Sequence, residues 1–184
     1  MTFYHGISMT ITKTLLTKPI KQIPEVLFYK KPYKSVMNPP QTEFLAISTT
    51  GDKNWGELVV HKTKMQFRDD YKGDTLAIDF IGTHKENKGL GATIIDFAKN
   101  YSEQIGCNGY IVLKAVSHFS KDSAPHIFYR KLGFTSLDKN FDKNLDSFIK
   151  NKQKVNPDIF PEKLMFYPEE KKLSFFEKIK NLFV

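Results

Sequence analysis

The sequence predicts a single mixed α/β domain in which a twisted, mostly antiparallel sheet is flanked by helices. Its 184 residues are 40% hydrophobic and 14% aromatic, which suits one domain with a core of ordinary size. The first half of the chain consists of short strand patterns joined by short polar turns, and short connections favour antiparallel neighbours. The second half alternates helical and strand patterns, so helices are expected to cover the sheet.

The first half contains four strand patterns, in which apolar and β-branched residues are concentrated. These patterns cover residues 25–30, 43–49, 55–63 and 75–83. The polar stretches "TGDKNWG" and "RDDYKGD" separate the last three patterns and are typical of turns. The first half is therefore predicted to form a meander of short strands.

A long helix is predicted to begin at Leu90, because apolar residues recur from there at helical spacing. They are Leu90, Ile94, Phe97 or Ala98, Tyr101 and Ile105. Gly106 stands where a glycine that ends a helix is expected. A further strand pattern follows over residues 109–116.

Two more helices and a last strand are predicted after that strand. The first helix has Asp122 or Ser123 as its N-cap, tolerates Pro125 in its first turn and ends at Gly133. The second helix is amphipathic, and its apolar face is formed by Leu137, Phe141, Leu145 and Ile149. The last strand pattern covers residues 162–168.

Residues 1–168 are predicted to form the domain, and residues 169–184 a separate C-terminal helix that is basic and amphipathic. In "EEKKLSFFEKIKNLFV" the apolar face is formed by Leu173, Phe176, Ile179 and Phe183. Such a helix can lie on a membrane surface, but packing on its own domain or on a second subunit is favoured. A monomer and a homodimer both stay open.

The net charge of +8 comes almost entirely from lysine, since Arg68 and Arg130 are the only arginines among 28 basic residues. Lysine meets phosphates and bases as a point charge, without the bidentate geometry of arginine. No zinc-finger, helix-turn-helix or RNA-recognition signature accompanies the charge. A solvated lysine surface is therefore favoured over nucleic-acid binding.

The single cysteine, Cys107, excludes an intramolecular disulfide and a cysteine-based zinc site. No cluster of carboxylates or cysteines completes a metal site with His118 and His126, so no metal is expected. The sequence shows no secretory leader and no apolar run as long as a membrane span. We therefore expect a cytoplasmic protein.

A glycine pair, Gly89 and Gly91, stands between a strand and the start of the long helix. A helix N-terminus offers unpaired N–H groups and a partial positive charge, which together stabilise a phosphate. Glycine lacks the Cβ that would hold a phosphate away from the backbone. The loop lacks the Gly-Lys-Ser/Thr of a triphosphate-binding loop and the third glycine of a dinucleotide fingerprint. The alternative for the pair is a structural turn.

Residues 76–134 resemble the GNAT superfamily of acetyl-CoA-dependent N-acyltransferases. The family's Gln/Arg-x-x-Gly-x-Gly/Ala signature corresponds to "ENKGLG" at 86–91, and its Tyr-x-x-x-Gly-Phe pattern to "YRKLGF" at 129–134. The helix and strand between the two motifs match as well. Glu86 stands where Gln or Arg is usual, and Asp122 where Asn is frequent.

The resemblance implies a GNAT-like sheet and a site for acetyl-CoA as cosubstrate. The pyrophosphate would be held by the start of the helix, through the backbone amides of Asn87, Lys88, Gly89, Leu90, Gly91 and Ala92, with Thr93 beside them. The strand that ends at Thr83 would splay from the next one, and Ile81 and Thr83 would pair with the pantetheine amides. The N–H of Ile81 would polarise the acetyl carbonyl.

The resemblance also implies that Tyr129 donates a proton to the coenzyme A thiolate as it leaves. The alternative for this tyrosine is a core residue on an apolar helix face. The base that deprotonates the amine is open between Asp79, His118 and a water relay, and a purely structural role is open for each side chain. Asp79 lies two residues before Ile81, so strand alternation predicts both on one face.

The predicted function is transfer of an acetyl group from acetyl-CoA to a primary amine by direct attack, without a covalent enzyme intermediate. The alternative is a non-catalytic coenzyme A-binding or interaction module on the same fold. The identity of the amine acceptor is left open by the sequence. Residues 137–161 are expected to border the acceptor pocket.

Overall fold

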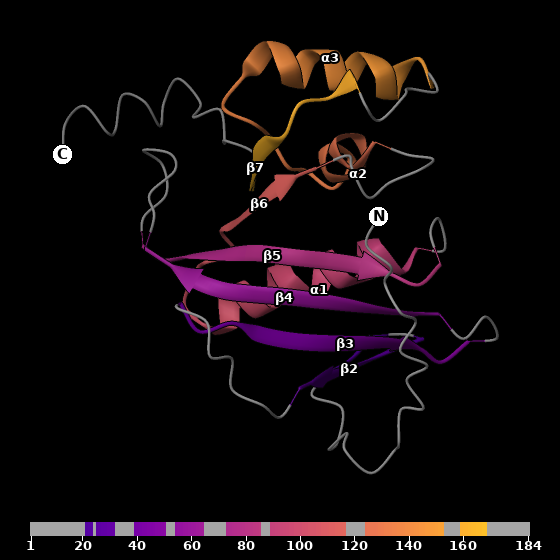
Figure 1. The fold of residues 1–184 in the computed structure, drawn as a ribbon, viewed down its shortest axis with the longest axis vertical. Helices are drawn as coiled ribbons and strands as arrows, with labels where there is room; N and C mark the ends of the chain where they lie inside the picture. Colours follow the sequence, from indigo (N-terminus) through magenta and orange to yellow (C-terminus); the bar gives the residue numbers. More distant parts are fainter. Residues whose placement is uncertain are drawn as a thin grey trace, which may run out of the picture.

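The computed structural model describes residues 21–23, 25–31, 39–50, 54–64, 73–85, 89–116, 124–152 and 159–168. They form a mixed α/β fold in which helices flank one seven-stranded sheet, whose strands follow one another in chain order (Figure 1). The first five strands are β1 (Lys21–Ile23), β2 (Val26–Lys30), β3 (Thr42–Ser48), β4 (Trp55–Thr63) and β5 (Thr75–Thr83). Each of them is antiparallel to the next, which confirms the predicted meander.

The second half supplies the remaining strands and all three helices of the described residues. The strands are β6 (Ile111–Ala115) and β7 (Lys163–Tyr167), and the helices are α1 (Leu90–Gln104), α2 (Pro125–Lys131) and α3 (Lys139–Lys150). β6 is parallel to β5 because α1 carries the chain back along the sheet, and β7 is antiparallel to β6. The predicted fold class, a mostly antiparallel sheet with flanking helices, is confirmed.

The core lies between α1 and the face of the sheet that this helix covers. The ring of Phe97 on α1 stacks on Phe28 at 4.1 Å between centroids and meets Phe44 edge-on at 5.0 Å. Ile94 lies over Gly56, where an added Cβ would come within 2.7 Å of its Cδ1 atom. The long helix therefore sits close against β4, because glycine leaves room for it there.

The end of α1 follows the glycine signal in the sequence. Gly106 has a left-handed φ of 80°, and the N–H of Cys107 donates to the carbonyl of Ser102 at 2.8 Å. Left-handed φ angles favour glycine because it has no Cβ. The predicted role of Gly106 is confirmed.

The starts of α2 and α3 differ from the prediction. The N-cap of α2 is Ala124 rather than Asp122 or Ser123, and it makes no side-chain cap bond. α3 begins after Asp138, whose side chain accepts hydrogen bonds from the N–H groups of Asn140 and Phe141. Leu137 therefore precedes the helix, and it is 64% exposed.

Several predicted features fall outside the described residues. They are the C-terminal helix over 169–184, the His118 side chain and residues 153–158 of the 137–161 segment. Among the helices that the structure describes, none is long and apolar enough to cross a membrane. The described ranges also contain no group of three or more metal-ligating side chains of the His, Cys, Asp and Glu type.

Candidate functional site

The sheet opens between β5 and β6. These strands pair over only three residues, from Leu76 opposite Ile111 to Ile78 opposite Leu113. β5 continues to Thr83 and β6 to Ala115, but the two strands diverge, as Figure 1 shows. One edge of β5 is therefore left without a strand partner from Asp79 onward. The predicted splay of the two strands is present.

A β-bulge in β5 lies at the point where the opening begins. Val60 pairs with Ile78 and Val59 with Phe80, so Asp79 is the extra residue of the bulge. Such an extra residue shifts the alternation of side chains along the rest of the strand.

The bulge separates Asp79 from Ile81. Ile78 and Ile81 both pack on the core beneath α1, although they are three residues apart. Asp79 instead contacts His61 on the opposite face of the sheet. The predicted shared face of Asp79 and Ile81 is therefore wrong, because regular alternation does not hold across the bulge.

Beyond the bulge, the backbone N–H and C=O groups of two β5 residues point into the opening. The N–H of His84 donates to the carbonyl of Trp55 at 2.8 Å, so this opposed pair is hydrogen-bonded. Opposed pairs of an antiparallel ladder alternate between bonded and unbonded. The pairs formed by Thr83 and Ile81 are therefore unbonded, and the N–H and C=O groups of these two residues face away from β4 toward the opening.

The N-terminus of α1 is uncapped. Its N-cap is Gly89, with a left-handed φ of 78°, and no side chain caps the helix or places an acid in the first turn. The N–H groups of Leu90, Gly91 and Ala92 have no partner within the helix, by helix geometry. The N–H of Thr93 closes the first turn on the Gly89 carbonyl at 3.2 Å.

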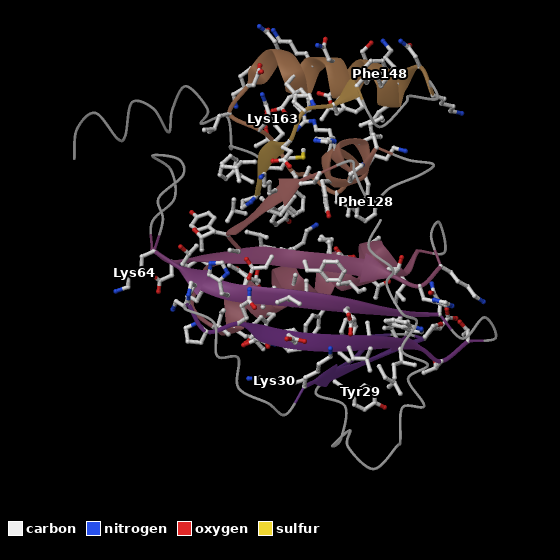
Figure 2. All side chains as sticks on the ribbon, in the orientation of Figure 1. Tyr29, Lys30, Lys64, Phe128, Phe148 and Lys163 are labelled. Atoms are coloured by element: carbon white, nitrogen blue, oxygen red, sulfur yellow. The ribbon has the colours of Figure 1, made fainter. Side chains whose placement is uncertain are left out.

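Glycine occurs at positions 89 and 91 for different structural reasons. A Cβ added at Gly89 would meet no atom within 4 Å, so its left-handed backbone requires glycine while the space beside it is open. A Cβ at Gly91 would lie 3.2 Å from the ring of Phe128 on α2. Figure 2 shows Phe128 projecting from α2 toward the layer of β5 and α1. Asn87 and Lys88, the other predicted residues of this loop, lie outside the described residues.

The start of the loop is fixed by Asn54, which the sequence analysis missed. Its side chain is buried, accepts from the N–H of Lys85 at 2.9 Å and donates to the carbonyl of the same residue at 3.2 Å. Beside it, the ring of His84 stacks on Trp55 with centroids 5.5 Å apart. Asparagine is common in turns, and no sequence signal distinguishes Asn54 from one that only makes a turn.

Tyr129 lies on the side of α2 that faces the core, and 7% of the tyrosine's surface is exposed. Its ring contacts Phe128 at 5.2 Å and Phe134 at 5.7 Å between centroids. Burial raises the pKa of Tyr129 well above its ordinary range, so the phenol keeps its proton throughout the physiological pH range. This group can donate a hydrogen bond but does not serve as a base.

The pattern that follows Tyr129 also has a structural reason. Gly133 has a φ of 87°, the N–H of Phe134 donates to the carbonyl of Tyr129, and the N–H of Gly133 donates to that of Arg130. This pair of bonds is a Schellman helix end. The Gly-Phe part of the motif therefore ends α2 and buries Phe134 completely.

Asp79 is held by two side chains, one from β4 and one from the residue just before β3. Its Oδ2 atom lies 2.7 Å from Nδ1 of His61 on β4 and accepts a hydrogen bond from Nε2 of Gln41 at 3.0 Å. Sequence reasoning did not identify His61, because its proximity to Asp79 depends on the register of β4 and β5. The other candidate base, His118, lies outside the described residues.

Comparison with known proteins gives distant structural likenesses. No family model and no curated protein matches the chain. NAA60 of Arabidopsis thaliana, solved in complex with acetyl-CoA, is 15% identical over 69% of this chain and 75% of that chain, with a TM-score of 0.43. The anti-CRISPR protein AcrVA5 is 18% identical over 61% and 88%, with a TM-score of 0.30. At this distance neither structure identifies a residue of the site.

Proposed function

We propose that this protein transfers an acetyl group from acetyl-CoA to a primary amine. The observation that carries the proposal is the opening between β5 and β6, which has unpaired backbone groups on one side and the uncapped N-terminus of α1 at its end. These two features match the two parts of an acyl-CoA that proteins bind through backbone groups, its peptide-like arm and its pyrophosphate.

The pantetheine arm carries amides, which can pair with β5 as an added strand would. The groups available for this pairing are the N–H and C=O of Ile81 and Thr83. Main-chain hydrogen bonds of this kind give affinity without any particular side chain. Binding through the main chain explains why an apolar residue such as Ile81 can belong to the proposed site.

The pyrophosphate suits the start of α1. The free N–H groups of Leu90, Gly91 and Ala92 and the helix dipole favour an anion there. The open space beside Gly89 allows close approach to the backbone. Asn87 and Lys88 complete the proposed loop, and their contribution is inferred from their place in the sequence.

The proposed chemistry uses two groups of the protein, the N–H of Ile81 and the phenol of Tyr129. The neutral amine attacks the carbonyl carbon, and the N–H of Ile81 stabilises the oxyanion that forms. The C–S bond breaks, the amide forms, and the thiolate leaves. Because the pKa of Tyr129 is raised by burial, its phenol stabilises the thiolate by donating a hydrogen bond rather than by giving up its proton completely. Solvent then supplies the thiol proton.

The test is calorimetric titration of the full chain with acetyl-CoA, together with thermal melts. We expect one-to-one binding. A hundredfold excess of ligand over its dissociation constant should add about 2.7 kcal/mol of stability, which corresponds to a melting shift of roughly 5–10 °C. Gly89→Val should weaken binding, because it places a branched side chain in the open space at the start of α1.

Turnover separates the enzyme from a binding module. Release of free thiol from acetyl-CoA in the presence of phenethylamine, spermidine or a lysine-containing peptide supports acyl transfer. Binding without thiol release on any of these amines would instead favour a non-catalytic coenzyme A-binding module. An absence of binding at millimolar acetyl-CoA would reject the proposal altogether.

A further inference from the structure

We infer that His61 is the base that takes the proton from the acceptor ammonium, and that Asp79 is the positioning residue that holds its ring. The inference rests on the proposed function, since it assigns a role within the same acyl transfer. His61 lies on β4 and Asp79 in the bulge of β5, directly beside the last residue that pairs with β6. The pair therefore stands at the apex of the opening.

The hydrogen bonds of Asp79 fix the state of the His61 ring. An ionised carboxylate only accepts hydrogen bonds, so both neighbours of Oδ2 must be donors. Gln41 donates through Nε2 at 3.0 Å, and His61 must donate through Nδ1 at 2.7 Å. In the neutral ring this leaves the lone pair on Nε2, where it can accept a proton.

The ring is sheltered but accessible. The side chain of His61 is 19% exposed and that of Asp79 is 28% exposed. Within the part of the chain that the structure describes, Nε2 of His61 has no hydrogen-bond partner. A substrate ammonium at this nitrogen would therefore displace no hydrogen bond of the described residues.

The face of the sheet on which His61 lies fits the approach of an amine. α1 and the core cover the other face, where Ile94 lies over Gly56. The face with His61 also carries Phe80, which is 51% exposed and whose ring lies over Gly82. A Cβ on that glycine would come within 2.8 Å of the Phe80 ring. This face offers an apolar surface beside the base.

The other strand carboxylates and lysines that the described residues place on this face are paired. Lys31 binds Glu43 at 3.0 Å and Glu57 at 2.8 Å, and both acids lie on the His61 face by strand alternation. On β6, Lys114 is on the same face by alternation and forms an ion pair with Glu162. Asp79 is thus the carboxylate in direct contact with the His61 ring.

In the proposed step, the acceptor ammonium loses a proton to His61 before its nitrogen attacks. A primary alkylamine is protonated at neutral pH and has no lone pair for attack. Nε2 of His61 takes one proton, the amine nitrogen attacks the thioester carbon, and the C–S bond breaks. Asp79 stabilises the imidazolium that forms. Of the three ammonium protons, one passes through His61 to solvent, one leaves the nitrogen for solvent as the amide forms, and one stays on the amide, while solvent supplies the proton of the thiol.

The position of the hydrogen on the neutral His61 ring can be tested without any substrate. Long-range proton–nitrogen spectra of the labelled chain report which ring nitrogen carries the hydrogen, and His61→Gln assigns the signals. We expect the hydrogen of the neutral ring on Nδ1. Asp79→Asn should remove this preference while leaving the fold intact. A wild-type ring that carries its hydrogen on Nε2 would overturn the inference.

The role in catalysis is tested with whichever of phenethylamine, spermidine and a lysine-containing peptide reacts fastest. His61→Gln should lower kcat/KM for the amine about a hundredfold at pH 7. The loss should shrink toward pH 10, because an alkylamine loses its own proton at about that pH. Asp79→Asn should give a smaller loss with the same pH dependence. A group with a merely structural role would not produce a deficit that depends on pH.

The controls separate this inference from the proposed function. Lys64→Gln removes an exposed basic side chain just beyond the end of β4, three residues after His61 (Figure 2), and should match wild type. Acetyl-CoA binding by His61→Gln should also match wild type. If wild type transfers acetyl groups and His61→Gln stays within threefold of it at pH 7, the base is another group. If wild type neither binds acetyl-CoA nor acetylates any of the three amines, the proposed function fails first.

Discussion

The side chain of Asn54 forms two hydrogen bonds with the backbone of Lys85, one to its N–H at 2.9 Å and one to its carbonyl at 3.2 Å. Asn54 lies just before β4 and Lys85 two residues after β5, so the contact joins the two chain segments at one end of this antiparallel pair. Its amide is buried and pairs with both backbone polar groups of Lys85, the residue that leads into the loop before α1. This contact positions the loop that the proposed function assigns to the pyrophosphate.

Asn54→Ala should therefore weaken acetyl-CoA binding more than it affects turnover. We expect KM for acetyl-CoA to rise about tenfold with little change in kcat, and stability to fall by about 1–3 kcal/mol because two backbone groups lose their partner. Steady-state kinetics and urea unfolding measure the two effects. Asn144→Ala, on the exposed surface of α3, is the matched control. A change in kcat alone would contradict this role of Asn54.

Gly56 is predicted to tolerate no side chain. A Cβ there would lie 2.6 Å from the backbone oxygen of Gly82 and 2.7 Å from Cδ1 of Ile94. Gly56→Ala should lower the free energy of unfolding by about 1–3 kcal/mol, because either α1 or β5 must shift. Shortening the helix residue in Gly56→Ala/Ile94→Val should recover only part of this, since the backbone clash persists. An unchanged urea midpoint for the single variant would contradict the packing described.

The sequence predicted the elements well where a local pattern defines them. β5 was predicted over 75–83 because a continuous apolar run is bounded by polar turns, and the structure has the same bounds. The end of α1 at Gly106 followed from a glycine signal that acts within one turn. In both cases the physical cause lies in residues that are neighbours along the chain.

The candidate site was less predictable, because its contacts depend on strand register. The bulge at Asp79 changes the face of every later residue of β5, and nothing local in "AIDFIG" indicates where an extra residue falls. The contacts of Asp79 with His61 and of Asn54 with Lys85 join residues 18 and 31 positions apart. The missing cap of α2 at Ala124 is a local error, since Asp122 and Ser123 resembled good caps.

His126 should make stability depend on pH. The residue is completely buried between Phe141 and Phe160, its Nε2 lies 3.0 Å from the carbonyl of Pro161, and its Nδ1 has no partner among the described residues. Burial lowers the pKa of His126 below its ordinary value, and the interactions of its ring with the backbone of Pro161 and Ala115 oppose this shift only in part. The unfolded chain therefore binds a proton more readily than the folded chain.

The contribution of neutral, buried His126 to the free energy of unfolding is fully present above the ordinary histidine pKa of about 6.5. This contribution is lost as the pH falls from there through the lowered pKa of His126 in the folded protein. Urea unfolding of wild type and His126→Gln between pH 5 and 8 measures it. The stability advantage of wild type over the variant should narrow as the pH falls. A difference that is constant, or that widens toward acid, would contradict the assignment.

The hydroxyl of Tyr129 gives the sharpest test of the proposed chemistry. Tyr129→Phe keeps the ring contacts with Phe128 and Phe134, so the fold and acetyl-CoA binding should be preserved. We expect kcat to fall about a hundredfold with KM nearly unchanged, because the lost hydrogen bond forms mainly as the thiolate leaves. Since burial raises the pKa of Tyr129, wild-type kcat should show no alkaline loss from this phenol up to about pH 10.

Tyr101→Phe, on the core side of α1, is the control for removing a tyrosine hydroxyl from the same core. It should leave kcat within about twofold of wild type, since its ring contacts Phe44 far from the start of the helix. Rapid-mixing measurement of thiol release separates the chemical step from product release in both variants. If Tyr129→Phe releases thiol as fast as Tyr101→Phe, the hydroxyl of Tyr129 contributes nothing to the reaction and its ring serves packing alone.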